Sequence, residues 1–166
     1  MPFDPLDFFK LAKVLYQSDL SSLLKDATFR TVIGRLYYSC FLTYRELLRQ
    51  LIRDRKYDRV ASSSAAHSCV IRLIKKLDIY LGNFLSQLHQ KRLVADYELY
   101  KCLDKKMIEE SLAIAEQLLS NTSIQSIKQN YKLKRTDVQR RLEDIYTKIF
   151  ERRPFNDKNH YNNTRN

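Results

Sequence analysis

Four residues of one short stretch, His89, Arg92, Asp96 and Tyr97, are of types that can bind a phosphate group and move protons around it. An imidazole takes up or releases a proton near neutral pH, and a guanidinium binds phosphate through paired hydrogen bonds. His89 lies three residues before Arg92, so a helix would place both on one face. Structural interpretations stay open as well. Asp96 could cap a helix or pair with Arg92 or Arg35, and Tyr97 could simply pack. His89 could be a solvated residue near a helix end.

The other two histidines and the three cysteines give no sign of a metal or cofactor site. His67 stands at the expected start of a helix, where packing or a local hydrogen bond is favoured over catalysis. No partner histidine or carboxylate follows any histidine in metal-ligand order. Cys40, Cys69 and Cys102 are odd in number and far apart, which is typical of reduced thiols. We expect no metal, no nucleotide-binding loop and no cofactor.

Positive charge is concentrated toward the C-terminus. The net charge is +11, and from residue 121 onward the chain has 11 Lys and Arg against 5 Asp and Glu. The basic residues that we single out there are Lys132, Lys134, Arg135, Arg140 and Arg141. They could follow an RNA backbone, although a solvated helix face is the usual role of such a run.

Apolar spacing predicts an all-α protein. Glycine occurs only twice and proline three times, which favours long helices over sheets with tight turns. Apolar residues recur at three- and four-residue steps, and the expected helices cover about residues 4–17, 27–55, 65–88, 107–119 and 124–150. Gly82 would mark a bend in the third helix, residues 54–64 a polar break, and residues 92–103 a less regular segment. We expect a bundle over 1–122, a basic helix over 123–153 and a disordered polar tail over 154–166.

Three segments, in order, resemble one branch of the HEPN family. Residues 29–41, F-R-T-V-I-G-R-L-Y-Y-S-C-F, are similar to its R-x-A-Y-Y-A-x-F helix, with Leu36 where the branch has Ala. Residues 67–70, H-S-C-V, resemble its H-x-x-V, and residues 91–97, K-R-L-V-A-D-Y, resemble its R-x-x-A-D-Y. The resemblance covers about residues 4–120 and leaves the C-terminal helix and tail unmatched.

The resemblance implies an up-and-down bundle of about five to six helices, here extended by the long basic helix, and a homodimer. Gly34 and Tyr37 on one helix face are compatible with a dimer contact, and we group His67 with these structural or dimer residues. Arg35, beside Tyr37 and Tyr38, is expected to be a buried cation paired with a carboxylate, for which Asp96 is the natural candidate.

Many HEPN proteins are metal-independent ribonucleases. Their signature is an Arg followed four to six residues later by a His, which both members of a dimer contribute to one cleft. Arg92 matches the Arg, and Tyr97 stands in the place of the His. A tyrosine, with a pKa near 10, is a poor base at neutral pH. The candidate catalytic set is therefore Arg92, Tyr97, Asp96 and His89, and the main proton carrier of the signature is replaced.

The sequence leaves three functions open. One is an RNA-directed HEPN protein, either an RNA binder or a metal-independent ribonuclease, of a prokaryotic defence or toxin–antitoxin system with an antitoxin as partner. The alternative is a non-catalytic HEPN module that partners a small nucleotidyltransferase or another protein, with Tyr97 as a site of modification. An unrelated bundle binding acidic protein or membrane would explain the charge but not the ordered motifs. We expect a cytoplasmic protein without membrane association, since no signal peptide or long apolar run is present.

Overall fold

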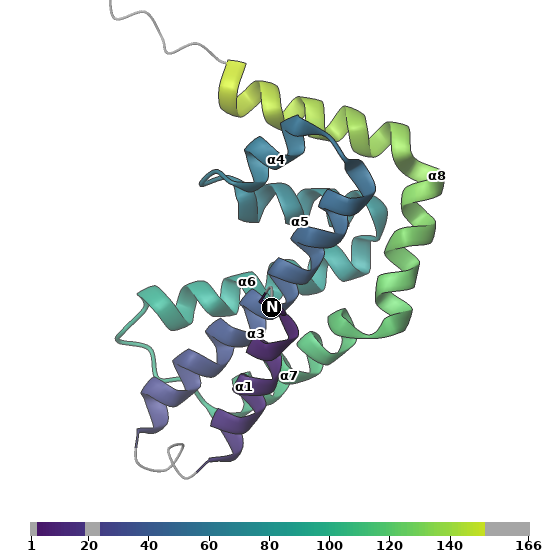
Figure 1. The fold of residues 1–166 in the computed structure, drawn as a ribbon. Coiled ribbons are helices and arrows are strands. Elements are labelled where there is room, and N and C mark those ends of the chain that lie inside the picture. Colours follow the sequence, from purple (N-terminus) through teal and green to yellow (C-terminus); the bar gives the residue numbers. More distant parts are fainter. Residues whose placement is uncertain (1–2, 19–23, 152–166) are drawn as a thin grey trace, which may run out of the picture.

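The computed structural model describes residues 3–18 and 24–151, and every regular element in these ranges is helical. Figure 1 shows how the helices pack around the long helix α3. The elements are α1 (Leu6–Gln17), α3 (Lys25–Ile52), α4 (Arg55–Ala61), α5 (Ala66–Leu77), α6 (Ile79–Tyr97), α7 (Lys105–Leu119), α8 (Asn121–Tyr146) and a π-helical turn, η1 (Thr147–Glu151). The all-α prediction is confirmed. None of the described helices is long and apolar enough to span a bilayer.

Helix α3 forms the centre of the core because its apolar residues recur at steps of three and four. Val32, Ile33, Leu36 and Cys40 are fully buried, and α1, α6 and α7 pack against this helix. The helix ends where Arg53 adopts a left-handed conformation, with φ of 50°, and its N–H donates to the carbonyl of Arg49. Tyr44 joins α3 to α7 through a buried hydroxyl that donates to the carbonyl of Leu118 at 2.8 Å.

The expected bent helix over residues 65–88 is two helices. Asp78 has an extended backbone that ends α5, and its carboxylate caps α6 by accepting from the N–H groups of Tyr80 and Leu81 at 3.0 and 3.1 Å. Gly82 is not the bend; it lies where α6 crosses close to Lys75 of α5. Helix α6 then continues to Tyr97, so the segment from residue 92 is more regular than predicted.

The polar break expected over residues 54–64 contains the short helix α4. Asp54 caps it by accepting from the N–H of Lys56 at 2.7 Å. Tyr57 and Val60 are fully buried, so the helix closes one end of the core. Such a short helix has too few apolar residues for its periodicity to be visible in the sequence.

Helix α8 bends around the bundle instead of running straight from residue 124 to 150. It begins at Asn121 and is kinked at Lys134, where φ is −111° and ψ is 17°. It packs against α5, α4 and α7, and Figure 1 shows it in green turning over the side of the molecule. The expected basic segment 123–153 is thus bound along the bundle up to the π-helical turn. The tail expected over 154–166 lies outside the described residues.

Candidate functional site

A pair of histidines from two different helices forms the centre of the candidate site. His67 is the second residue of α5, and His89 lies in the middle of α6. Their rings are stacked, with centroids 5.3 Å apart and planes 21° from parallel. Tyr37 of α3 contacts both, since its hydroxyl is 2.7 Å from Nδ1 of His67 and its ring centroid is 5.0 Å from that of His89. Three helices therefore meet at two imidazoles.

Tyr37 holds the His67 ring in one orientation. It is fully buried on α3, and burial raises the pKa of its hydroxyl, so the phenol stays neutral. The Phe41 ring packs against His67 with the centroids 4.3 Å apart. Because Tyr37 occupies Nδ1, the nitrogen of His67 that remains available to a ligand is Nε2.

The surroundings keep both imidazoles neutral at pH 7. Burial is the main cause that lowers the pKa of His67 from 6.5 to about 4. His89 when it is protonated, and the charges of Arg92 and Arg45, act in the same direction. Burial, and then the charge of Arg92, lowers the pKa of His89 as well. A neutral imidazole can accept a proton, so the pair begins as a proton acceptor rather than as a cation.

Arg92 brings a positive charge beside the histidines. Its Nη2 donates to the hydroxyl of Tyr38 at 3.1 Å, and its Cζ lies 5.4 Å and 5.5 Å from the ring centroids of Tyr38 and Tyr97. Nε is 2.7 Å from the carboxylate of Asp96, an ion pair in which the buried N–H is not aligned as a hydrogen bond. The guanidinium is therefore fixed in place, and a buried donor is left without an aligned acceptor.

Arg45 is a second arginine of this site that the sequence analysis missed. Its Cζ lies 5.6 Å from the Phe41 ring, and its buried Nε–H has no hydrogen-bond acceptor. Arg45 and Phe41 are four residues apart on α3, and Phe41 is four after Tyr37, so all three lie on one helix face. Continuing the Tyr-Tyr segment along that face would have found them. Arg45 therefore offers a buried guanidinium donor to an anion, whereas Arg92 already pairs with the carboxylate of Asp96.

The structure brings together only part of the predicted catalytic set. His89 is half-buried against Tyr37 and His67, so its interpretation as a solvated residue near a helix end is wrong. Tyr97 is 69% exposed at the end of α6, and its aromatic contact is with Arg92. The described residues thus bring His89 to His67 and Tyr37, while Tyr97 lies at the surface beside Arg92.

The expected pair between Arg35 and Asp96 is absent. Asp96 pairs with Arg92, which is four residues earlier on the same helix. Arg35 instead lies over the ring of Phe8, with 4.8 Å from Cζ to the centroid, and it is only half-buried. Asp96 pairs with the cation nearer to it on the same helix face, and the guanidinium of Arg35 packs on an aromatic ring of α1.

The basic residues expected to bind RNA along α8 lie in different surroundings. Lys134 donates to the carbonyl of Leu77 at 2.9 Å and so caps the C-terminal end of α5, which makes its role structural. Lys132 and Arg135 are exposed. Arg140 and Arg141 line a hollow between α5 and α8.

The glycine expected at a dimer contact has free space around it in this chain. A Cβ built on Gly34 would meet nothing within 4 Å beyond its own helix backbone and chain neighbours. No helix among the described residues therefore requires a glycine at this position. The described residues contain no group of three side chains suited to hold a metal ion.

Comparison with known proteins gives relatives but no family. The chain is 29% identical over 157 residues to the uncharacterized protein MJ0628 of Methanocaldococcus jannaschii, which covers 86% of this chain and 91% of that protein. It is also 29% identical over 130 residues to the uncharacterized protein MJ0992 of the same archaeon, over 68% of this chain and 73% of that protein. No family model matches, and no solved structure matches.

Proposed function

We propose that this protein is a metal-independent endoribonuclease of the HEPN type, with His67 and His89 as proton carriers and Arg92 as the phosphate-binding group. One observation carries the proposal: the two imidazoles stack 5.3 Å apart at the arginine of the signature, where Tyr97 alone would lack a proton carrier. The resemblance adds a homodimer and a prokaryotic defence or toxin–antitoxin system, with an antitoxin as partner, as the setting.

The reaction needs only the RNA itself and these side chains. Neutral His67 accepts the proton of a 2′-hydroxyl, whose oxygen attacks the adjacent phosphorus while the bond from phosphorus to the 5′-oxygen breaks. Protonated His89 gives its proton to that departing oxygen, which leaves a 2′,3′-cyclic phosphate and a 5′-hydroxyl. Arg92 stabilises the added negative charge of the phosphorane.

Substrate binding provides the protonated histidine that the reaction requires. In the free protein, burial and the nearby cations oppose protonation of His89. A phosphate bound at Arg92 would cancel that positive charge and favour the imidazolium. The second proton would then be taken up together with the substrate.

The test is cleavage of a labelled single-stranded RNA in EDTA, with analysis of the product ends. We expect cyclic phosphate and 5′-hydroxyl ends, and a loss of about 100-fold or more in His89→Ala, as for removal of a general acid or base. Arg92→Gln should lose RNA cleavage as well. Gln90→Ala is the matched control because Gln90 is exposed on the same helix. Binding of intact RNA without cleavage by the wild type would reject the nuclease and retain an RNA-binding protein.

The exposure of Tyr97 favours a second candidate, the non-catalytic partner of a small nucleotidyltransferase. Its side chain is 69% exposed, and its ring lies beside the cation of Arg92, which could hold the phosphate of an incoming nucleotide. A nucleotidyl group on Tyr97 would appear in the intact mass of the protein isolated from its own cells. Tyr97→Phe should abolish that added mass. An unmodified mass would reject this candidate.

A further inference from the structure

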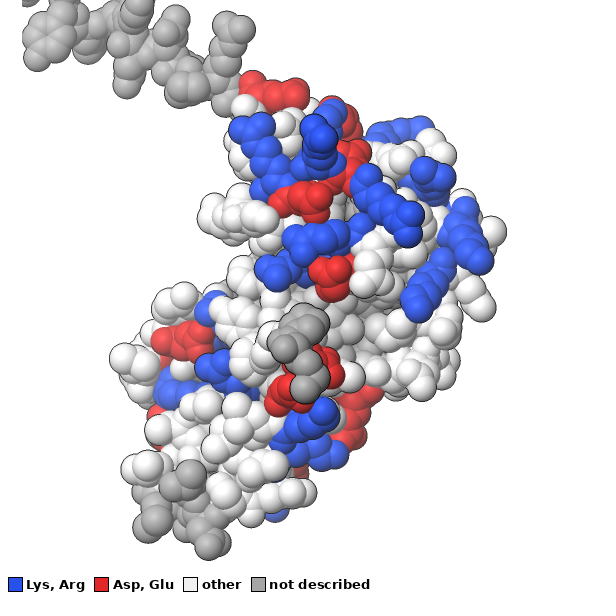
Figure 2. Space-filling model, viewed as in Figure 1, with Lys and Arg blue, Asp and Glu red and all other residues white. Residues whose placement is uncertain are grey.

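A hollow between α5 and α8 is lined almost entirely by charged side chains. Its volume is about 380 Å³, and its lining consists of Arg72, Lys75, Lys76, Asp137, Arg140, Arg141 and Asp144. Five cations against two carboxylates leave a surplus of three positive charges. Figure 2 shows Lys and Arg side chains gathered over α8 on this side of the molecule.

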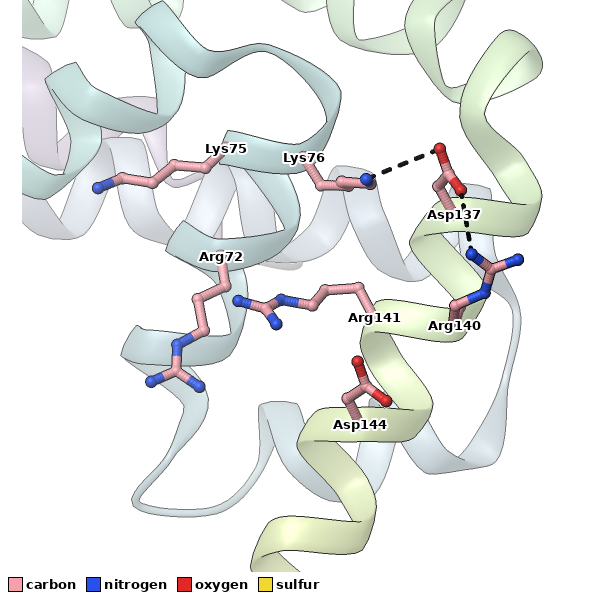
Figure 3. A pocket seen from close by; sticks show the side chains of 7 residues that line it. All are labelled: Arg72, Lys75, Lys76, Asp137, Arg140, Arg141 and Asp144. Carbon is pink, nitrogen blue, oxygen red and sulfur yellow. Dashed lines mark ion pairs between the residues drawn. The ribbon is translucent and has the colours of Figure 1, made fainter.

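Arg72 and Arg141, on the two sides of the hollow, form no ion pair among the described residues. Figure 3 shows the Arg72 and Arg141 side chains extending from facing helices into the same space. Among the described residues, no ion pair joins either guanidinium to a carboxylate. Like charges on facing walls repel each other, and an anion between them would turn that repulsion into attraction.

Asp137 is bound to other cations of the hollow, whereas Asp144 forms no ion pair among the described residues. Asp137 lies 3.7 Å from Nζ of Lys76 and 4.0 Å from a guanidinium nitrogen of Arg140, on the side away from Arg72. The kink at Lys134 directs the second half of α8 over α5, and the Lys134 ammonium on the carbonyl of Leu77 fixes that bend. The two walls of the hollow are therefore held by the fold.

We propose that this hollow binds neighbouring phosphates of a single-stranded RNA backbone, as a second site apart from the histidine pair. The inference rests on the proposed RNA-directed function and adds a substrate class, an RNA chain long enough to reach both sites. Two guanidinium forks on facing walls suit phosphate oxygens, which accept paired hydrogen bonds. Bases would not enter the recognition, so binding is independent of sequence.

The test measures binding of fluorescent 2′-O-methyl oligouridylate, which cannot be cleaved through a 2′-hydroxyl, as a function of salt. We expect Arg72→Gln with Arg141→Gln to weaken binding and to reduce the slope of log K against log salt by about 1.4, which is about 0.7 for each lost phosphate contact. The matched control is Lys25→Gln with Lys106→Gln, since it removes the same charge from residues without an ion pair elsewhere on the described surface. The control should keep the wild-type slope.

A double Arg→Lys variant at positions 72 and 141 should keep most of the slope, which separates loss of charge from damage to the fold. Equal salt slopes for the Arg72→Gln/Arg141→Gln variant and the lysine control would overturn the inference. Competition by polyglutamate as strong as that by RNA of equal charge would also overturn it, in favour of an acidic protein.

Cleavage of the dinucleotide uridylyl-adenosine distinguishes this inference from the proposed function. A dinucleotide carries a single phosphate, which cannot occupy the histidine site and the hollow at once. The Arg72→Gln/Arg141→Gln variant should therefore cleave it at the wild-type rate while losing affinity for long RNA. Absence of dinucleotide cleavage together with a reduced salt slope would reject the nuclease and keep the phosphate site. Normal dinucleotide cleavage with an unchanged salt slope would keep the nuclease and reject the phosphate site.

Discussion

The hydroxyl of Tyr37 lies 2.7 Å from Nδ1 of His67, and this contact joins the central helix α3 to the first turn of α5. Both residues belong to the segments that resemble the HEPN family. The contact orients an imidazole whose other nitrogen is free for a ligand, so Tyr37 is a positioning residue in the proposed site.

Tyr37→Phe should therefore reduce cleavage without abolishing it. The ring still packs, but His67 loses its hydrogen-bond partner and can rotate. We expect a fall in kcat smaller than the roughly 100-fold loss of a general base, and a loss of about 1 kcal/mol in the free energy of unfolding. Steady-state kinetics and urea unfolding measure the two effects. A purely structural role would lower stability and leave the acidic limb of the pH–rate profile in place, whereas a positioning role shifts it.

The pH dependence of cleavage should show a maximum on the acidic side of neutrality. The base must be neutral, so activity rises through the pKa of His67, which is about 4. The acid must be protonated, so activity falls through the pKa of His89, which is lowered from 6.5. The profile of kcat/KM, which reports the free enzyme, should be bell-shaped with its maximum between these values. A maximum above pH 7 would contradict the assignment of the two histidines.

The stability of the fold should also fall with acid because of His67. The unfolded chain binds this proton with a pKa near 6.5 and the folded chain with a pKa of about 4, so protons favour unfolding between these values. His67→Gln removes that contribution. Thermal unfolding should show a smaller drop in Tm from pH 6.5 to 4 for the variant than for the wild type. Parallel Tm curves would show that His67 is not buried as described.

The sequence predicts the helices well where apolar periodicity is long, as in α3 and α7. It fails at Asp78, because an aspartate that caps one helix and ends another needs neither glycine nor proline. It also fails at the kink of α8, where Lys134 donates a hydrogen bond to a carbonyl distant in sequence. Local patterns contain no information on such contacts.

The candidate site was predictable in its members but not in its pairing. Arg92 and His89 follow from helix spacing, and Tyr37 and His67 occur in the ordered segments. That His67 meets His89 depends on how α5 folds back on α6 after Asp78. The break at Asp78 was itself not predicted. The cations of α5 in the basic hollow were missed for the same reason. Arg72 becomes part of a hollow only because α8 places Arg141 opposite it.

The two glycines of the chain should respond oppositely to alanine. A Cβ on Gly82 would lie 2.5 Å and 2.6 Å from the backbone N and Cα of Lys75, and neither helix can yield without moving the histidines of α5 and α6. We expect Gly82→Ala to destabilise the protein by about 1–3 kcal/mol, as overpacking does, in spite of its better helix propensity. Gly34→Ala meets open space and should stabilise the isolated chain by up to about 1 kcal/mol.

Gly34→Ala also tests the predicted dimer contact at this glycine, because the described residues leave open space beside it. If two copies approach closely there, the added methyl group separates them. Sedimentation would then show a weaker dimer although chemical unfolding of the monomer shows a more stable fold. A variant that is more stable and dimerises as the wild type does would place any dimer interface away from Gly34.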